Sequence, residues 1–82
     1  MMKIAITIWG NRISPVFESA KNLLIARIEG QKVIEKKYET FDCQPFKMIA
    51  YFHKTDVNVV ICGAISDTSA TMITASGITL IP

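Results

Sequence analysis

Residues 57–62, Val-Asn-Val-Val-Ile-Cys, form the most continuous β-branched run in the chain, and neither a glycine nor a charge interrupts it. This composition is typical of a central parallel strand that is covered on both faces of its sheet. Such a strand reaches its neighbours through a helical crossover, which is right-handed in nearly all proteins. The run therefore predicts a mixed α/β sheet.

The segments on either side of this run have helical patterns. A helix is expected over about residues 44–54, with Asp42 as its N-cap and apolar residues at helical spacing. A second helix is expected to begin after Ser66 and to end near residue 76, because Ser66 is a good capping residue. Residues 78–81 then predict a last short strand.

The N-terminal half predicts three further strands. Residues 3–9 alternate between the two faces of a strand, and a turn and loop follow over residues 10–17. The apolar run 23–28 suits a strand buried on both faces. Residues 32–41 should pair with it as an antiparallel hairpin, because Gly30 supplies the positive φ that a tight connection needs.

The expected element order is therefore β β β α β α β, in one domain over residues 1–82. The likeliest arrangement of the five strands is 3-2-1-4-5, with strand 2 antiparallel and helices on the faces. The connections leave strands 1 and 4 in opposite directions, so their carboxyl ends flank a crevice of the kind in which open α/β sheets bind ligands. The loop 10–17 and residues 62–65 should line this crevice.

Composition excludes several functions. A net charge of +2 is too small and too scattered to indicate nucleic acid or an anionic membrane surface, and no apolar stretch is long enough to span a bilayer. We therefore expect a cytoplasmic protein whose two cysteines begin as free thiols. No hydrolytic triad or phosphate loop is present, and no Asp falls on the first strand, where a nuclease would need a carboxylate. These observations argue against a hydrolase, a phosphate-loop protein and a nuclease.

Two segments resemble a known family. The start MKIAITIWGNRISPVFESA (residues 2–20) and the later VNVVICGAIS (residues 57–66) are similar to the dinitrogenase iron-molybdenum cofactor biosynthesis family. These are small nitrogenase accessory domains with a ribonuclease H-like mixed sheet. The resemblance implies non-enzymatic binding or delivery of iron-sulfur clusters, of the iron-molybdenum cofactor or of their precursors, with cofactor-assembly or nitrogenase proteins as partners.

The chain departs from that family at two places. Many members have His-Phe-Gly after the first loop, whereas this chain has Val16-Phe17-Glu18, so ligation by that histidine does not carry over. Members also commonly continue into another helix after the fifth strand, whereas this sequence stops at Pro82. We therefore expect that either the sequence is incomplete or one face of the sheet is uncovered.

Cys62 is the first candidate metal ligand. Iron in sulfide clusters prefers thiolate, and the end of a strand near a helix start should favour the charged form of the thiol. The alternative is a small buried residue at a strand end. Cys43, at the start of the first helix, is the second candidate metal ligand. The alternative is that Cys43 is a semi-exposed residue at the helix start without a functional role. One cysteine cannot hold a cluster alone, so a cluster would be shared or would keep its own coordination.

Residues around these thiols complete the candidate cofactor-binding site. Gly10 and Gly63 should allow close approach of the backbone, to each other or to a ligand, and Ala64 follows Gly63 in the crevice. Arg12 is suited to an anionic ligand, and it stands with Asn11 and Ser14 on the first loop. A solvated loop arginine is the alternative for Arg12.

Three functions remain open. The first is a carrier for an iron-sulfur cluster or the iron-molybdenum cofactor. The second is a metal-free interaction module that forms a homodimer through exposed sheet or an uncovered apolar face. The third is a regulatory domain that binds an anion with Arg12 and the helix start at Ser66.

Overall fold

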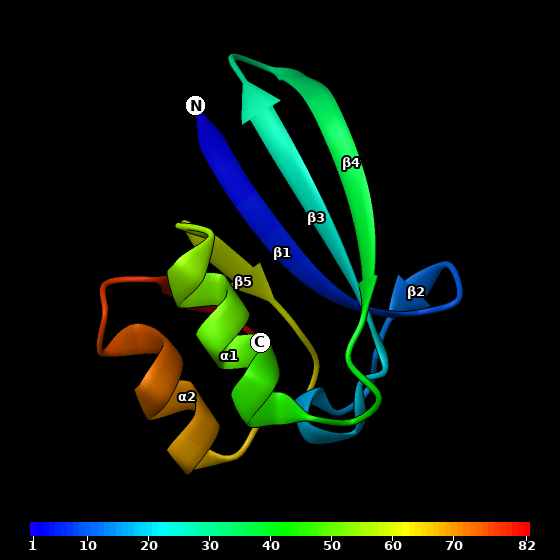
Figure 1. Cartoon of the computed structure of the whole chain (residues 1–82), viewed down its shortest axis with the longest axis vertical. Helices are drawn as coiled ribbons and strands as arrows, with labels where there is room; N and C mark the ends of the chain where they lie inside the picture. The colour runs from blue at the N-terminus through cyan, green and yellow to red at the C-terminus, as the bar shows by residue number, and fades with distance from the viewer.

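The computed structural model describes all of residues 1–82, and one twisted sheet with two helices accounts for most of them (Figure 1). The strands are β1 (Met2–Trp9), β2 (Arg12–Ile13), β3 (Asn22–Glu29), β4 (Lys32–Thr40), β5 (Val59–Ile61) and β6 (Thr79–Ile81). The helices are α1 (Pro45–Lys54) and α2 (Asp67–Thr74), and a single 3-10 turn, η1, covers Phe17–Ser19.

The strand order confirms the predicted topology. The order is β4-β3-β1-β5-β6, in which β3 runs antiparallel to β1, and β5 runs parallel to it. If β2 is left out and the other five strands are numbered 1 to 5 along the chain, this is the expected order 3-2-1-4-5 with strand 2 antiparallel. The register pairs Ala5 of β1 with Ile25 on one side and with Val60 on the other. The carboxyl ends of β1 and β5 therefore lie side by side, as the switch point requires.

A sixth strand, β2, was not predicted from the sequence, which indicated a loop there. Its two residues pair with the end of β1, Trp9 opposite Arg12 and Ile8 opposite Ile13. Gly10 and Asn11 make the connection, and Gly10 has a φ of 65°, which suits the first position of a two-residue hairpin turn. The carboxyl end of β1 is thus extended into a short hairpin.

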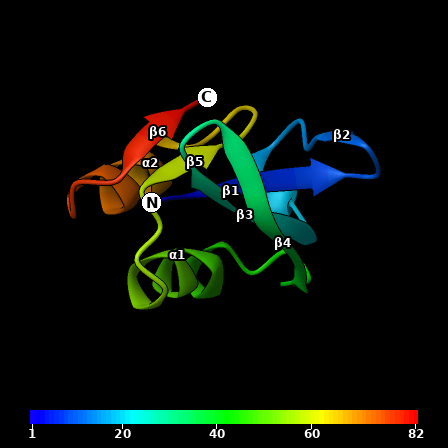
Figure 2. The same ribbon diagram turned by 90° about the horizontal axis from the view of Figure 1, so that it is seen from above.

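One face of the sheet, the covered face, packs against the helices. Ala5, Leu23 and Val60 from the strands are buried together with Phe52 of α1 and Ile73 of α2. Phe17 of η1 belongs to the same core, with its ring centroid 6.3 Å from that of Phe52. Figure 2 shows α1 beneath the sheet and β2 on the side away from α1.

The opposite face, the open face, has no helix. Successive strand side chains alternate between faces, so the register assigns its members. They include Ile4, Ile6 and Ile8 of β1, Leu24 and Ala26 of β3, Lys36 and Tyr38 of β4, and Val59 and Ile61 of β5. All of these but Ala26 are at least partly exposed. The expectation that the strands over 23–28 and 57–62 are covered on both faces is therefore wrong.

The start of α1 also differs from its prediction. Asp42 and Cys43 both have positive φ, at 46° and 58°, so Asp42 turns the chain and does not cap the helix. The N-cap is Gln44, whose side chain makes no capping bond, and Pro45 is the first helical residue. The cap of α2 agrees with prediction, because the Ser66 hydroxyl accepts a hydrogen bond from the Ser69 amide at 3.2 Å. Neither helix has the length and hydrophobicity needed to cross a membrane.

Candidate functional site

The predicted crevice between the carboxyl ends of β1 and β5 is closed by the chain itself. The loop after β2 lies along the segment that follows β5, and Val16 forms a parallel bridge with Ala64. The Ala64 amide donates to the Pro15 carbonyl and the Phe17 amide donates to the Ala64 carbonyl, both at 2.8 Å. These two bonds fasten the loop over the switch point.

Gly63 makes this closure sterically feasible. A Cβ at Gly63 would collide with the backbone carbonyl oxygens of Ser14 and Pro15, on the loop that the two bonds to Ala64 hold in place. Only a residue without a side chain fits such an approach. Gly63 does allow a close approach of two backbones, but the neighbour is the protein's own loop and not Gly10, which has no atom within 4 Å of a Cβ placed on it.

Cys62 lies beneath this loop, in the core. Only 2% of the residue is exposed, and it packs in the same cluster as Ala5 and Val60. Burial raises the pKa of its thiol, and the negative charge of Glu18 raises it further. The expectation that its surroundings favour the thiolate is therefore wrong. Ligation by Cys62 remains a prediction, and it requires the loop to open.

Glu18, which stands where many family members have glycine, binds the start of α2. Its carboxylate accepts a hydrogen bond from the Ser66 hydroxyl at 2.8 Å and others from the Ser66 amide at 3.3 Å. Partial burial raises the pKa of Glu18, but hydrogen bonding by Ser69 and Ser66 outweighs burial, and the net pKa is below its ordinary value. A carboxylate at a helix N-terminus is also favoured by the helix dipole. Glu18 therefore ties η1 to α2.

Cys43 is exposed, and its position differs from that of Cys62. Its thiol donates to the Ser19 carbonyl at 3.3 Å, so it lies against η1. Both cysteines are free thiols, as predicted. Cys43 is thus the thiol that a ligand in solution can reach without a change in the fold.

A hollow of about 410 Å³ opens next to η1 at the carboxyl end of β1. Its lining includes Trp9, Ser14, Ser19, Lys21 and Asn22. Ser14 was predicted as a site residue, and it is buried, with its amide bonded to the Thr7 carbonyl at 2.8 Å. Lys21 was missed, because nothing near it in the sequence shows that β1 and η1 will fold around it.

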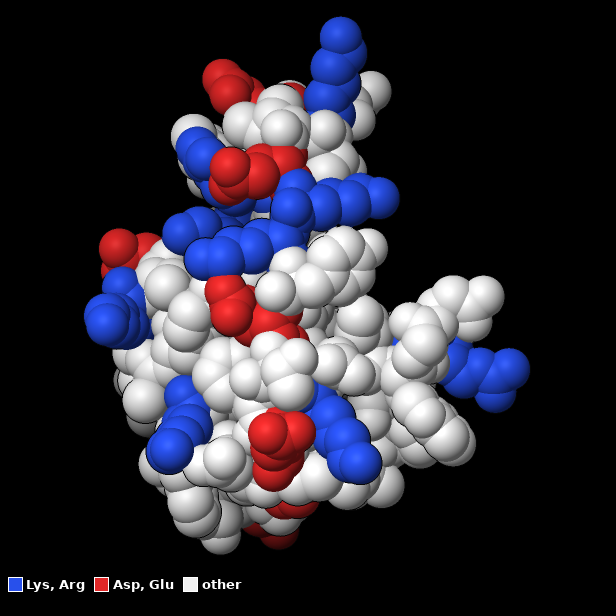
Figure 3. All heavy atoms as spheres, turned by 45° about the vertical axis from the view of Figure 1, so that its right-hand side comes forward, with Lys and Arg blue, Asp and Glu red and all other residues white.

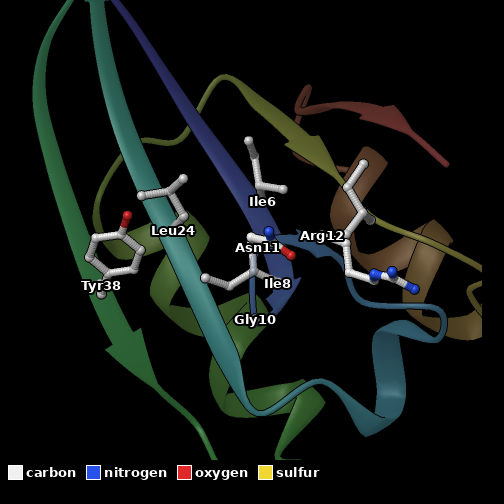
Figure 4. A pocket seen from close by; sticks show the side chains of 8 residues that line it. Ile6, Ile8, Gly10, Asn11, Arg12, Leu24 and Tyr38 are labelled. Carbon is white, nitrogen blue, oxygen red and sulfur yellow. The ribbon is translucent and has the colours of Figure 1, made fainter.

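Arg12 and Asn11 lie apart from the buried thiol. Asn11 is on the β1–β2 turn and Arg12 is the first residue of β2. Both line a second groove, of about 400 Å³, together with Ile6, Leu24 and Tyr38 on the open face (Figure 4). The predicted cofactor-binding set is therefore divided. Ser14, Cys62, Gly63 and Ala64 meet at the switch point, whereas Arg12 and Asn11 belong to the rim of the open face.

The donor set for a metal is incomplete in this conformation. Nowhere in the chain do three or more His, Cys, Asp or Glu side chains gather closely enough to hold a metal ion. Iron-sulfur clusters usually take four thiolates, and this chain has two cysteines, one of them buried. The side chains therefore do not fit a resident cluster held by this chain alone.

Comparison with known proteins identifies the family. A family model described as dinitrogenase iron-molybdenum cofactor matches residues 1–82. The chain belongs to this family. The family is associated with iron-molybdenum cofactor biosynthesis and with dinitrogenase-like domains. The resemblance noted from residues 2–20 and 57–66 is thereby confirmed.

Solved structures of similar fold agree with this membership. The crystal structure of MJ0327 from Methanocaldococcus jannaschii, named as a candidate dinitrogenase, is 30% identical with a TM-score of 0.78, and the match covers 96% of this chain and 72% of that one. The NMR structure of the same protein gives a TM-score of 0.79, again at 30% identity, over 96% and 71% of the two chains. PH0822 shares the fold at 18% identity, with a TM-score of 0.84 over 98% of this chain and 77% of that one. No curated protein matches the sequence.

Proposed function

We propose that this domain of the iron-molybdenum cofactor family is a non-enzymatic carrier. Its cargo is an iron-sulfur cluster, the iron-molybdenum cofactor or a precursor of either, and it delivers that cargo to cofactor-assembly or nitrogenase proteins. The observation that supports this proposal best is the exposed thiol of Cys43, which bonds to the carbonyl of Ser19, a residue that lines the hollow together with Lys21. Such a carrier works in the reducing cytoplasm, where free thiols persist.

The chemistry of the hollow suits an anionic cluster. Cys43 offers a soft sulfur ligand, and Lys21 offers a compact positive charge to sulfide or carboxylate groups of the cargo. Cys43 is not a lining residue of the hollow, but its thiol bonds to the carbonyl of Ser19, which is one. Because one thiol cannot complete a cluster, the cargo keeps its other ligands or shares them with the acceptor. Weak, incomplete coordination is suited to a protein that must give up its cargo.

Anaerobic reconstitution with iron and sulfide tests the proposal. Wild-type protein should develop thiolate-to-iron absorption, and native mass spectrometry should report the metal content and the number of subunits. Cys43→Ala should abolish the absorption, and Lys21→Glu should weaken loading. Lys32→Glu makes the same charge change at the far end of the β3–β4 hairpin and should load normally.

Cys62→Ala separates the two thiols. It should leave loading intact if Cys43 is the ligand. Loss of loading in Cys62→Ala with normal loading in Cys43→Ala would overturn the assignment to Cys43 and show that the loop over the switch point opens. Absence of any cluster in wild-type protein, supplied also with a preformed cluster, would refute the carrier function.

A metal-free interaction module is the second candidate. The apolar open face favours it, since partly exposed isoleucine and leucine side chains lie together there. The anion-binding candidate loses its basis, because the amide and hydroxyl of Ser66 are already bonded to Glu18 and Arg12 lies in β2, paired with Trp9. The open face is therefore the surface where a partner is to be sought.

A further inference from the structure

The only tryptophan of the chain, Trp9, lines the hollow at the carboxyl end of β1. Tryptophan is on average a largely buried residue, yet 65% of Trp9 is exposed. The hollow measures about 410 Å³, which is within the range of about 300–1,000 Å³ that small-molecule sites occupy. An exposed indole in a cavity of this size offers a surface on which a planar ring can stack.

Polar groups of three kinds share the hollow with this indole. Lys21 supplies a cation, and its ammonium group makes no ion pair. The amide oxygen of Asn22 accepts a hydrogen bond from the Thr40 hydroxyl at 3.1 Å, so the amide nitrogen keeps its two donors for a ligand. Ser19 adds a hydroxyl group. No Asp or Glu is among the lining residues, so no carboxylate in the lining opposes an anion.

We infer that the hollow binds a mononucleotide, with its heteroaromatic ring stacked on Trp9 and its phosphate paired with Lys21. Every nucleotide base has a π face for the indole, and the polar atoms of the ligand can accept from the Asn22 amide. One ammonium group is a compact charge that suits a single phosphate. The chain has no glycine-rich phosphate loop, which sites for longer phosphate chains commonly use. This inference goes beyond the proposed carrier function and does not depend on it.

The hollow is held in shape by contacts within the chain. All of its lining residues fall within residues 8–22, from the end of β1 to the start of β3. The loop in this stretch is bonded to Ala64 by two backbone hydrogen bonds of 2.8 Å, and Glu18 ties η1 to Ser66 at 2.8 Å. Walls that are fixed before binding reduce the entropy that a small ligand must overcome.

The surface charge favours a single nucleotide over a nucleic-acid strand. Binding along a strand requires a row of cations that follows the phosphates. Figure 3 shows basic and acidic side chains interleaved over the β3–β4 hairpin, at the top of the view, whereas the surface toward β2 is largely uncharged. Within the hollow, Lys21 is the one charged lining residue. A row of phosphates would therefore find no matching row of cations.

Tryptophan fluorescence tests the inference, because Trp9 is the only residue that gives this signal. AMP is added to the metal-free protein, since a cluster in the hollow would exclude it. Excitation at the red edge of tryptophan absorption avoids absorption by adenine. We expect quenching that saturates, in contrast to the collisional quenching of a free tryptophan derivative, which rises in proportion to AMP.

Two changes remove the same phosphate contact. Lys21→Gln should weaken AMP binding about tenfold, and adenosine, which lacks the phosphate, should bind wild type about tenfold more weakly than AMP does. Adenosine should bind Lys21→Gln and wild type equally, because it has no phosphate for Lys21 to contact. Lys32→Gln removes a cation at the far end of the β3–β4 hairpin and should leave the affinity for AMP unchanged.

The contribution of the indole is measured by equilibrium dialysis with labelled AMP. Trp9→Ala should weaken binding at least about fivefold, and Trp9→Phe, which keeps a smaller ring, should weaken it less. Circular dichroism checks that these variants fold, as expected for substitutions of an exposed side chain.

Four results would overturn the inference. The first is quenching by AMP that does not saturate. The second is an affinity for AMP that is the same in Lys21→Gln as in wild type. The third is equal affinity for AMP and inorganic phosphate in dialysis, which would show that the ring takes no part. The fourth is tighter binding of a single-stranded oligonucleotide than of AMP, which would identify nucleic acid as the ligand. Because no metal is present, failure of cluster loading leaves these outcomes unaffected.

Discussion

Replacement of Gly63 by alanine tests the closure of the switch point most directly. The added methyl group would meet the carbonyl oxygens of Ser14 and Pro15, which are backbone atoms and cannot rotate away. Overpacking of this kind costs about 1–3 kcal/mol. If the loop moves to relieve it, the two bonds between the loop and Ala64 are lost at about 1 kcal/mol each.

The expected loss for Gly63→Ala is therefore about 1–3 kcal/mol of unfolding free energy, by whichever route the strain is relieved. A domain of this length has a total stability of about 4–12 kcal/mol, so the variant should be clearly destabilised but in most cases still folded. Urea denaturation measures the change. Ala64→Ser, an exposed substitution one residue along, is the control and should stay within about 0.5 kcal/mol of wild type.

Two local measurements show whether the loop has opened. Amide hydrogen exchange at Ala64 and Phe17 should lose protection in Gly63→Ala, because these amides make the bonds that fasten the loop. In a Cys43→Ser background, Cys62 should also react faster with a thiol reagent. A variant as stable as wild type, with both amides protected, would refute the idea that close backbone approach at Gly63 holds the switch point shut.

Three further predictions concern single side chains. Glu18→Gln should destabilise the protein by about 1 kcal/mol near neutral pH. Because the folded pKa of Glu18 lies below its ordinary value of 4.5, its contribution is present above that pH and is lost as the pH falls through the folded pKa, so wild type and variant should converge in acid. Cys43 should react with a thiol reagent at the rate of an exposed thiol, and Cys62 should react much more slowly because it is buried. Mass spectrometry of single-cysteine variants measures the two rates, and equal rates would contradict the burial of Cys62. Thr7→Val should be neutral or stabilising by about 1 kcal/mol in thermal unfolding, because the buried Thr7 hydroxyl has no hydrogen-bond partner, and a large loss would show that it has one.

The strands and their order were predictable because local patterns determine them. Alternation in residues 3–9 indicated β1, and Gly30, with a φ of 64°, indicated the β3–β4 hairpin. The β-branched run over 57–62 indicated the central parallel strand β5. In each case the signal lies within a few residues of the element that it specifies.

The missed features depend on contacts between distant segments. β2 has only two residues, too few for a periodic pattern, and it exists because the turn at Gly10 returns the chain to β1. The burial of Cys62 depends on a loop that begins nearly fifty residues earlier. Glu18 acquires a role only when η1 meets α2, 48 residues away in the sequence. Asp42 was wrongly predicted as a cap because the tertiary path of the chain places it in a turn.

The charge pairs along β4 have a consequence for how the molecule can assemble. β4 is an outer strand of the sheet, and Lys32, Glu35, Lys36 and Lys37 crowd it with charge. Charged side chains on an edge strand such as β4 disfavour pairing with a strand of another polypeptide, which is a common route to fibrous aggregates. Growth of the sheet beyond β4 is therefore disfavoured, because an incoming strand would have to strip water from these charges.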